Sequence, residues 1–212
     1  MDDANDPRPG VLAIWHACRE SRLAAFEHWY QTEHLAERLA VPGFLRGRRY
    51  GAADSRTRFF TCYEVDSPDV LFSEAYLARV NAPTEQTRQI MATAFTEMNR
   101  TVCRTVWQSG RMSGAWAVTC KGAVADRLVA QARALGADDG IARIAVWQRA
   151  AEGDGTGSVE QDIRGRDAQI DACLCVETLR IEDAERVARA LTPGEMTAEP
   201  PEIFRLLCEL TA

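Results

Sequence analysis

The sequence lacks the short signatures of the common nucleotide-dependent and metal-dependent enzymes. It holds no glycine-rich phosphate loop of either standard pattern, no Gly-x-Ser-x-Gly nucleophile elbow, no His-Glu-x-x-His and no Cys-x-x-Cys. Only 3 of the 212 residues are histidine. Nucleotide-dependent chemistry and zinc hydrolysis are therefore not expected.

Long apolar runs and basic clusters are missing as well. No segment approaches the ~20 consecutive apolar residues of a membrane span. The net charge is −6 and the arginines are scattered, which disfavours nucleic acid and anionic membrane surfaces as partners. The N-terminus is acidic and has no apolar core, unlike a signal peptide, so we expect a cytoplasmic protein.

The cysteines do not suggest a disulfide framework or a metal site. There are seven, an odd count, and most lie in apolar segments, which predicts buried free thiols in a reducing compartment. His16 and Cys18 lie two residues apart on an expected strand, but two ligands are too few for a metal ion. Cys173 and Cys175 have no histidine near them and are interpreted as core.

The first half of the chain has the pattern of a ferredoxin-like unit. Residues 1–9 are expected to form a disordered tail, and Ser21 is a candidate N-cap for the first helix, which ends at Pro42-Gly43. The order is strand, helix, strand, strand, helix, strand, which is the split βαβ motif. The strands are expected at residues 11–18, 44–50, 58–65 and 101–108, and the second helix from about 68 to 98 with a break near 81–83.

The same order of elements recurs in the second half with little sequence identity. Residues 153–165 are polar and glycine-rich, and we interpret them as a mobile loop. The chain is therefore expected to be an α+β protein with two tandem ferredoxin-like βαββαβ halves, residues 10–110 and 113–212. The second-half strands are expected at 115–120, 141–148, 172–179 and 203–210, and the helices at 123–135 and 181–191.

Two such halves have a physical reason to pack together. Each four-stranded sheet carries both helices on one face and leaves an apolar face bare. If the two bare faces meet within one chain, they form a barrel that can enclose a pocket. The expected assembly is a monomer with an internal pseudo-dimer, and a homodimer through a further surface stays open.

The densest cluster of unusual residues lies in the first helix and the strand that follows it. It reads Phe26-x-x-Trp29-Tyr30-x-x-x-His34, then Pro42-Gly43-Phe44 and Arg48-Arg49-Tyr50. Over residues 11–108 the chain resembles the EthD-like family of the dimeric α+β barrel (ferredoxin-like) superfamily. The second half has no histidine and no matching Pro-Gly turn, so any active pocket is expected mainly in the first half.

His34 is the leading catalytic candidate. At helical spacing it shares a face with Phe26 and Tyr30, and an imidazole with an ordinary pKa of ~6.5 can move protons near neutral pH. The resemblance implies that this histidine lies at the pocket. The alternative is a structural histidine whose nitrogens are both hydrogen-bonded in the core.

The candidate substrate-binding residues are aromatic or cationic. In a strand Tyr63 shares a face with Phe59, so Glu64 must point to the other face. Arg100 could clamp a carboxylate through its planar fork, or it could be a solvated turn residue. For the tyrosines, ordinary sheet packing is the alternative. The full set is Phe26, Trp29, Tyr30, Tyr50, Tyr63 and Arg100.

The resemblance implies a small cofactor-independent enzyme of isomerase, cyclase or lyase type. Its substrate would be a small apolar, aromatic or lactone-like metabolite, and His34 would perform acid–base chemistry on it. One alternative is a non-catalytic small-ligand-binding or auxiliary protein, because this fold carries many activities. Another is a haem-binding barrel with His34 or His16 as axial ligand.

Overall fold

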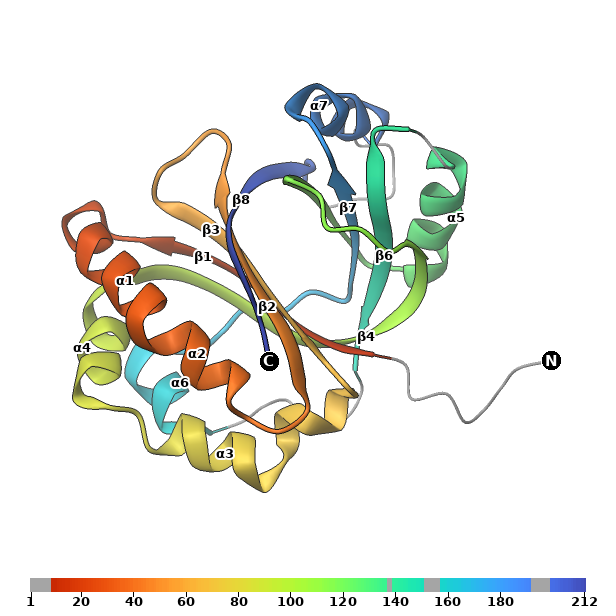
Figure 1. Ribbon diagram of the computed structural model, residues 1–212. Helices are drawn as coiled ribbons and strands as arrows, with labels where there is room; N and C mark the ends of the chain where they lie inside the picture. Colours follow the sequence, from red (N-terminus) through yellow and green to blue (C-terminus); the bar gives the residue numbers. More distant parts are fainter. Residues whose placement is uncertain (1–8, 137–138, 151–156, 192–198) are drawn as a thin grey trace.

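The computed structural model describes residues 9–136, 139–150, 157–191 and 199–212. In this part of the chain eight strands close into one barrel, and every neighbouring pair is antiparallel (Figure 1). The strands are β1 (Gly10–Cys18), β2 (Phe44–Ala52), β3 (Arg58–Val65), β4 (Phe95–Gly110), β5 (Trp116–Gly122), β6 (Ile141–Arg149), β7 (Ala172–Thr178) and β8 (Glu202–Thr211).

Helices cover the outside of this barrel in two groups. In Figure 1, α1 to α4 lie over the first-half strands, and α5 and α7 lie over the second-half strands. The helices are η1 (Glu20–Arg22), α1 (Leu23–Trp29), η2 (Tyr30–His34), α2 (Leu35–Leu39), η3 (Pro68–Phe72), α3 (Glu74–Asn81), α4 (Glu85–Thr93), α5 (Ala125–Leu135), α6 (Val159–Arg164) and α7 (Ile181–Ala190). Among the described residues, no helix is long and apolar enough to cross a membrane.

The strand order confirms two ferredoxin-like halves. Around the barrel it runs β1-β3-β2-β8-β5-β7-β6-β4, so the first half reads β4-β1-β3-β2 and the second reads β8-β5-β7-β6. Numbered within its own half, each sheet has the order 4-1-3-2. The halves join where β2 pairs with β8 and where β4 pairs with β6. The expected intrachain α+β barrel is therefore present.

Large side chains fill the middle of the barrel interior, where the sequence analysis allowed a pocket between the two sheets. Trp15, Tyr50, Phe60, Trp147 and Phe204 form a buried cluster there. Trp15 stacks on Phe60 with ring centroids 4.9 Å apart, and Tyr50 stacks on Phe60 at 5.4 Å. These rings fill the middle of the small barrel, and a wider opening of about 490 Å³ at its end is lined by Trp15, Lys121 and Phe204 among others.

Four charged residues inside the barrel connect the two halves. Arg48 on β2 donates to Glu177 on β7 at 2.5 Å, and Arg143 on β6 donates to Glu64 on β3 at 2.5 Å. Arg48 also donates to Glu64 at 2.5 Å. Since β2 and β3 correspond to β6 and β7 in strand order, each half supplies one arginine and one glutamate from equivalent strands.

Several element boundaries differ from the prediction. Ser21 lies inside η1 and is not an N-cap; Arg19 precedes that helix and makes no side-chain cap. The second helix stops at Thr93, because Phe95 to Met98 belong to β4, whose pairing with β1 extends to this end of the sheet. The expected loop 153–165 contains α6, which begins at the N-cap Ser158; residues 153–156 lie outside the described residues, as do residues 1–8 of the expected tail.

The second half has no counterpart of the first-half pocket in its described residues. Its outer sheet face and helices α5 and α7 meet in one packed aliphatic cluster that includes Leu128, Leu174 and Val187. All seven cysteines are free, and only Cys208 is partly exposed. This fits the prediction that they behave as small apolar residues.

Candidate functional site

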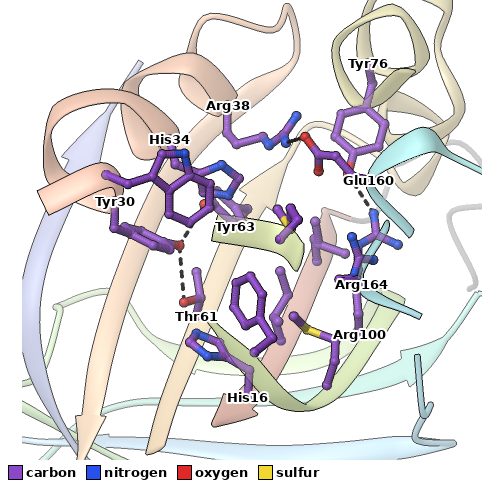
Figure 2. A pocket seen from close by; sticks show the side chains of 16 residues that line it. His16, Tyr30, His34, Arg38, Thr61, Tyr63, Tyr76, Arg100, Glu160 and Arg164 are labelled. Carbon is purple, nitrogen blue, oxygen red and sulfur yellow. Dashed lines mark hydrogen bonds and ion pairs between the residues drawn. The ribbon is translucent and has the colours of Figure 1, made fainter. Parts of the chain in front are cut away.

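The candidate site is a cavity between the helices and the outer face of the first-half sheet. Its lining comes from β1, β3 and β4 below, from the α1–η2–α2 segment and α3 and α4 above, and from α6 at the side (Figure 2). The cavity measures about 40 Å³, which is room for a few water molecules. Met91 and Met98 are among the lining residues, and their unbranched side chains can move to admit a larger molecule.

A π-helical turn shapes the upper wall of this cavity. Tyr30–His34 forms the five-residue π turn η2 between α1 and α2. A π turn pairs residues five apart, and such turns are common at functional sites. Here it brings Trp29 and His34 together with ring centroids 4.2 Å apart, while Trp29 Nε1 donates to Thr87 Oγ1 at 2.9 Å and fixes the indole.

His34 lines the cavity and has unused hydrogen-bonding capacity. The residue is 8% exposed, and its Nδ1 is buried without a partner among the described residues. Within the described part of the chain, neither ring nitrogen has a hydrogen bond to protein. Burial, then the Arg38 and Arg164 cations, lower the pKa of His34 well below its usual value. At neutral pH the imidazole is therefore uncharged and can accept a proton.

A chain of hydroxyl groups runs beside His34. Tyr30 donates to Thr61 Oγ1 at 3.3 Å, and the Tyr30 and Tyr63 hydroxyls lie 2.8 Å apart. Because Tyr30 gives its proton to Thr61, Tyr63 must donate to Tyr30. Burial raises the pKa of both tyrosines, so both stay protonated at neutral pH. These groups can orient a polar atom of a ligand without carrying charge.

His16 also lines the cavity; the sequence analysis considered it only as a metal ligand beside Cys18 or as an axial haem ligand. Its ring packs between Phe26, Phe59 and Phe95 with centroids 5.1 to 5.3 Å away, and its Nδ1 is buried without a partner. Burial and the nearby Arg49 cation lower the pKa of His16 to about 3. The alternation of β1, which places Leu12, Ile14 and His16 on the helix side, is the signal that could have identified it.

The other end of the cavity is charged. Arg38 on α2 donates to Glu160 on α6, and this ion pair is almost fully buried. Arg100 Nη2 on β4 donates to the Tyr76 hydroxyl at 2.6 Å. Arg164, also on α6, completes this end, opposite Tyr30 in Figure 2.

The structure brings five of the predicted residues together. His34, Trp29, Tyr30, Tyr63 and Arg100 all line the cavity. As expected from strand alternation, Tyr63 lies on this face of β3, whereas Glu64 bonds to arginines inside the barrel.

Phe26 and Tyr50 do not line the cavity, contrary to the prediction. Phe26 is fully buried under the helix, where its ring meets His16 and the Arg49 guanidinium. Tyr50 pairs with Phe60 in the sheet and shares its inward face. Strand alternation therefore directs Tyr50 into the barrel core rather than toward the helices.

Helix α6 supplies two lining residues that the sequence analysis missed. It follows β6 of the second half, yet it packs against α3 and α4 of the first half, next to them in Figure 1. Its anchor is backbone pairing: Arg100 N donates to the Ala168 carbonyl at 2.9 Å, and Ala168 N donates to the Met98 carbonyl at 2.9 Å. Glu160 lies 122 residues from Arg38 in a short polar segment, so no local sequence pattern could predict that the two residues pair.

The buried histidines predict that the protein loses stability in acid. An unfolded histidine titrates near 6.5, whereas folded His16 titrates near 3, so below pH 6.5 the unfolded state binds a proton that the folded state does not. The contribution of neutral His16 to the free energy of unfolding is therefore complete above pH 6.5, and it is lost as the pH drops toward 3. From pH 7.5 to 5, we expect His16 alone to cost about 2 kcal/mol.

Urea unfolding at pH 7.5 and 5.0 tests this expectation. His16→Phe should reduce the difference in unfolding free energy between the two pH values by about 2 kcal/mol. The exposed His28 offers the control His28→Gln, which should leave the difference unchanged. An unchanged pH dependence in His16→Phe would show that this histidine is not buried in its neutral form.

Comparison with known proteins places this geometry in a known fold. The chain matches a solved anthrone oxidase-like protein with a TM-score of 0.58 and 11% identity, over 99% of this chain and 95% of that one. It matches a protein named as a monooxygenase from Fusobacterium nucleatum with a TM-score of 0.58 and 8% identity, over 96% and 94% of the two chains. It matches a protein named as a chlorite dismutase with a TM-score of 0.56 and 12% identity, over 95% of each chain. The chain has the dimeric α+β barrel fold.

The likeness extends over the whole barrel but stays at the level of fold. No family model and no curated protein matches the chain. Identities of 8 to 12% do not carry an activity from one dimeric α+β barrel to another. The function must therefore be argued from the cavity itself.

Proposed function

We propose that this dimeric α+β barrel protein is an enzyme that removes a proton from a small, largely apolar metabolite, with neutral His34 as the proton acceptor. The observation that carries the proposal is an uncharged imidazole at a cavity wall with no protein hydrogen bond on either nitrogen in the described residues. Buried polar atoms in proteins nearly always have partners. A substrate atom or a water molecule is the natural partner for the His34 ring nitrogen.

The neighbouring residues fit the same chemistry. His34 takes the proton from a C–H or O–H bond, and the electron pair stays on the substrate as an enolate or related anion. Tyr63 donates to Tyr30 and Tyr30 to Thr61, so the Thr61 hydroxyl at the end of this chain keeps its proton and can donate to the oxygen that gains charge. Return of the proton from His34 to a different carbon completes an isomerisation, and the step needs no cofactor.

A second candidate is oxidation of the same anion by molecular oxygen. It is supported by the fold neighbours, which are named as anthrone oxidase-like or as monooxygenases. Conversion of a CH₂ group to C=O consumes one O₂ and releases one water, so O₂ is the oxidant and the balance closes. The first step is again proton removal by His34.

The cavity residues do not fit haem. Within this cavity, three phenyl rings surround His16 and His34 stacks on Trp29, so neither imidazole faces an open coordination space there. The cavity of about 40 Å³ must widen by movement of its lining methionines to admit even one small ring, and a haem macrocycle is far larger than such a movement can admit. The second half contains no histidine, and its helix–sheet layer is packed. In the described residues no three His, Cys, Asp or Glu side chains are grouped to hold a metal ion.

Deuterium exchange tests the proposal without knowledge of the natural reaction. We expect the protein, incubated in D₂O with a panel of small cyclic ketones, lactones and phenols, to catalyse deuterium incorporation at an acidic carbon of at least one of them. Parallel runs with and without oxygen, with O₂ uptake recorded, separate isomerisation from oxidation. Saturable binding without exchange or uptake for every bound compound would instead favour a non-catalytic binding protein.

A further inference from the structure

The charged end of the cavity holds more positive than negative charge. Arg38, Arg100 and Arg164 line it together with one carboxylate, Glu160. Asp167, just outside the lining, is paired with Arg164 at 2.6 Å. Three guanidinium groups therefore face two carboxylates, and since both cavity histidines are neutral, one positive charge is left over.

Arg38 is a buried cation with a donor to spare. Its side chain is 3% exposed, and its Nη2 donates to Glu160. Its Nη1 is also buried, and no atom in the described part of the chain accepts from it. A buried, unpaired N–H of a charged group costs free energy, so a ligand that accepts from it is favoured.

Arg100 supplies the charge that is left over. Its Nη2 donates to the Tyr76 hydroxyl at 2.6 Å, and it has no carboxylate partner among the residues that the structure describes. The Arg38 guanidinium lies 5.9 Å from the centre of the Tyr76 ring. Tyr76 therefore contacts both arginines and keeps them at the same end of the cavity (Figure 2).

We propose that this end of the cavity binds the carboxylate of a substrate with a single negative charge, held by Arg38 Nη1 and Arg100. The inference rests on the proposed function and narrows its substrate to an apolar monocarboxylic acid. The planar fork of arginine matches the two oxygens of a carboxylate. One negative charge is what the three guanidiniums and two carboxylates leave unbalanced.

The carboxylate would also strengthen His34 as a base. The Arg38 cation is one of the causes that lower the pKa of His34. A ligand anion beside Arg38 offsets that cation, so the pKa rises toward the neutral range, where a general base works best. Substrate binding and base strength are thereby coupled through one arginine.

Matched pairs of an acid and its neutral amide test the proposal directly. The probes are benzoate with benzamide, and the smaller propionate with propionamide. Calorimetry, together with NMR of the ring nitrogens of the three histidines, reports binding without any turnover. We expect each acid to bind saturably with a Kd at least about tenfold below that of its amide, because hydrogen bonds to charged groups are the stronger ones. Equal affinity within both pairs, or no binding of either acid, would overturn the proposal.

Arg100→Leu, with Arg79→Leu as its control, and Glu160→Gln test whether Arg100 and Arg38 hold the anion. Arg100→Leu should weaken benzoate at least about tenfold and leave benzamide unchanged, while Arg79→Leu, outside the cavity lining, should change neither. Glu160→Gln removes the carboxylate that competes for Arg38 and should tighten benzoate binding. Weaker benzoate binding in folded Glu160→Gln would contradict the proposal. If that variant does not fold, the Arg100→Leu result alone decides.

The outcomes separate this inference from the proposed function. If the protein binds no anion but still catalyses His34-dependent deuterium exchange, the carboxylate site is rejected and the proposed enzyme activity stands. If the protein binds the anion but catalyses no deuterium exchange, the carboxylate site is supported and the catalytic role of His34 is rejected.

Discussion

We expect His34→Gln to lower the rate of the exchange reaction by at least about 100-fold while the fold stays intact. A positioned acid–base group contributes about 10²–10⁴ in rate, and glutamine cannot accept the proton. Stability should change little, because no protein hydrogen bond to His34 is lost among the described residues and a buried unpaired Nδ1 is removed. The rate should be measured beside a melting curve of the same preparation.

The exposed His28 on the same helical segment supplies the control. His28→Gln should retain full activity. The pH profile gives a second signature: because the pKa of His34 is lowered, kcat/KM of the wild type should be flat above neutral pH and decline only in acid, as His34 takes up a proton. A destabilised but fully active His34→Gln would mean that the histidine is structural.

The architecture could be predicted because it depends on patterns that are local in sequence. Alternation placed Tyr63 and Glu64 on opposite faces of β3, and helical spacing placed Tyr30 and His34 on one side of the first helix. Both patterns are enforced by burial: a one-residue shift would bring Glu64 to the helix side and Tyr63 into the barrel. Local patterns therefore placed Tyr30, His34 and Tyr63, whereas Trp29 came from the family resemblance and Arg100 from the chemistry of its side chain.

The parts of the site that could not be predicted depend on contacts between distant segments. The π turn at Tyr30–His34 cannot be seen in a pattern that assumes α-helical spacing, yet it sets the Trp29–His34 stack. Helix α6 is short and polar, and only its packing on the first half brings Glu160 to Arg38. Tyr50 was misplaced because its motif was read without applying strand alternation to β2.

The one-chain form of this dimeric α+β barrel has a consequence for the site. In a pair of identical subunits both pockets would be equal, whereas here the halves have diverged. The second half fills its own helix–sheet layer with aliphatic side chains and sends α6 to the first-half pocket. The second half therefore supplies one wall of the first-half cavity, and packing between the halves becomes a condition for the proposed function.

That packing depends on buried charges, so we expect Glu177→Gln to lower the unfolding free energy by about 3–5 kcal/mol. Glu177 is 2% exposed and accepts from Arg48, which is 1% exposed, and from the Gly114 backbone N–H at 3.0 Å. Glutamine keeps the shape and can still accept from Gly114, so the loss is that of the charge. Arg48 and Arg143 would then share the single carboxylate of Glu64 in a low-dielectric interior.

Urea unfolding at pH 7.5 measures this loss, and two further variants show its cause. Glu209→Gln removes a partly exposed carboxylate 3.9 Å from Arg46 and should cost at most about 1 kcal/mol, as surface ion pairs do. The double variant Arg48→Met/Glu177→Leu removes both charges, and it should recover much of the stability because apolar pairs can replace buried ion pairs. If Glu177→Gln unfolds within about 1 kcal/mol of the wild type, water must reach the barrel interior, and strand pairing with the aromatic cluster around Phe60 would hold the halves together.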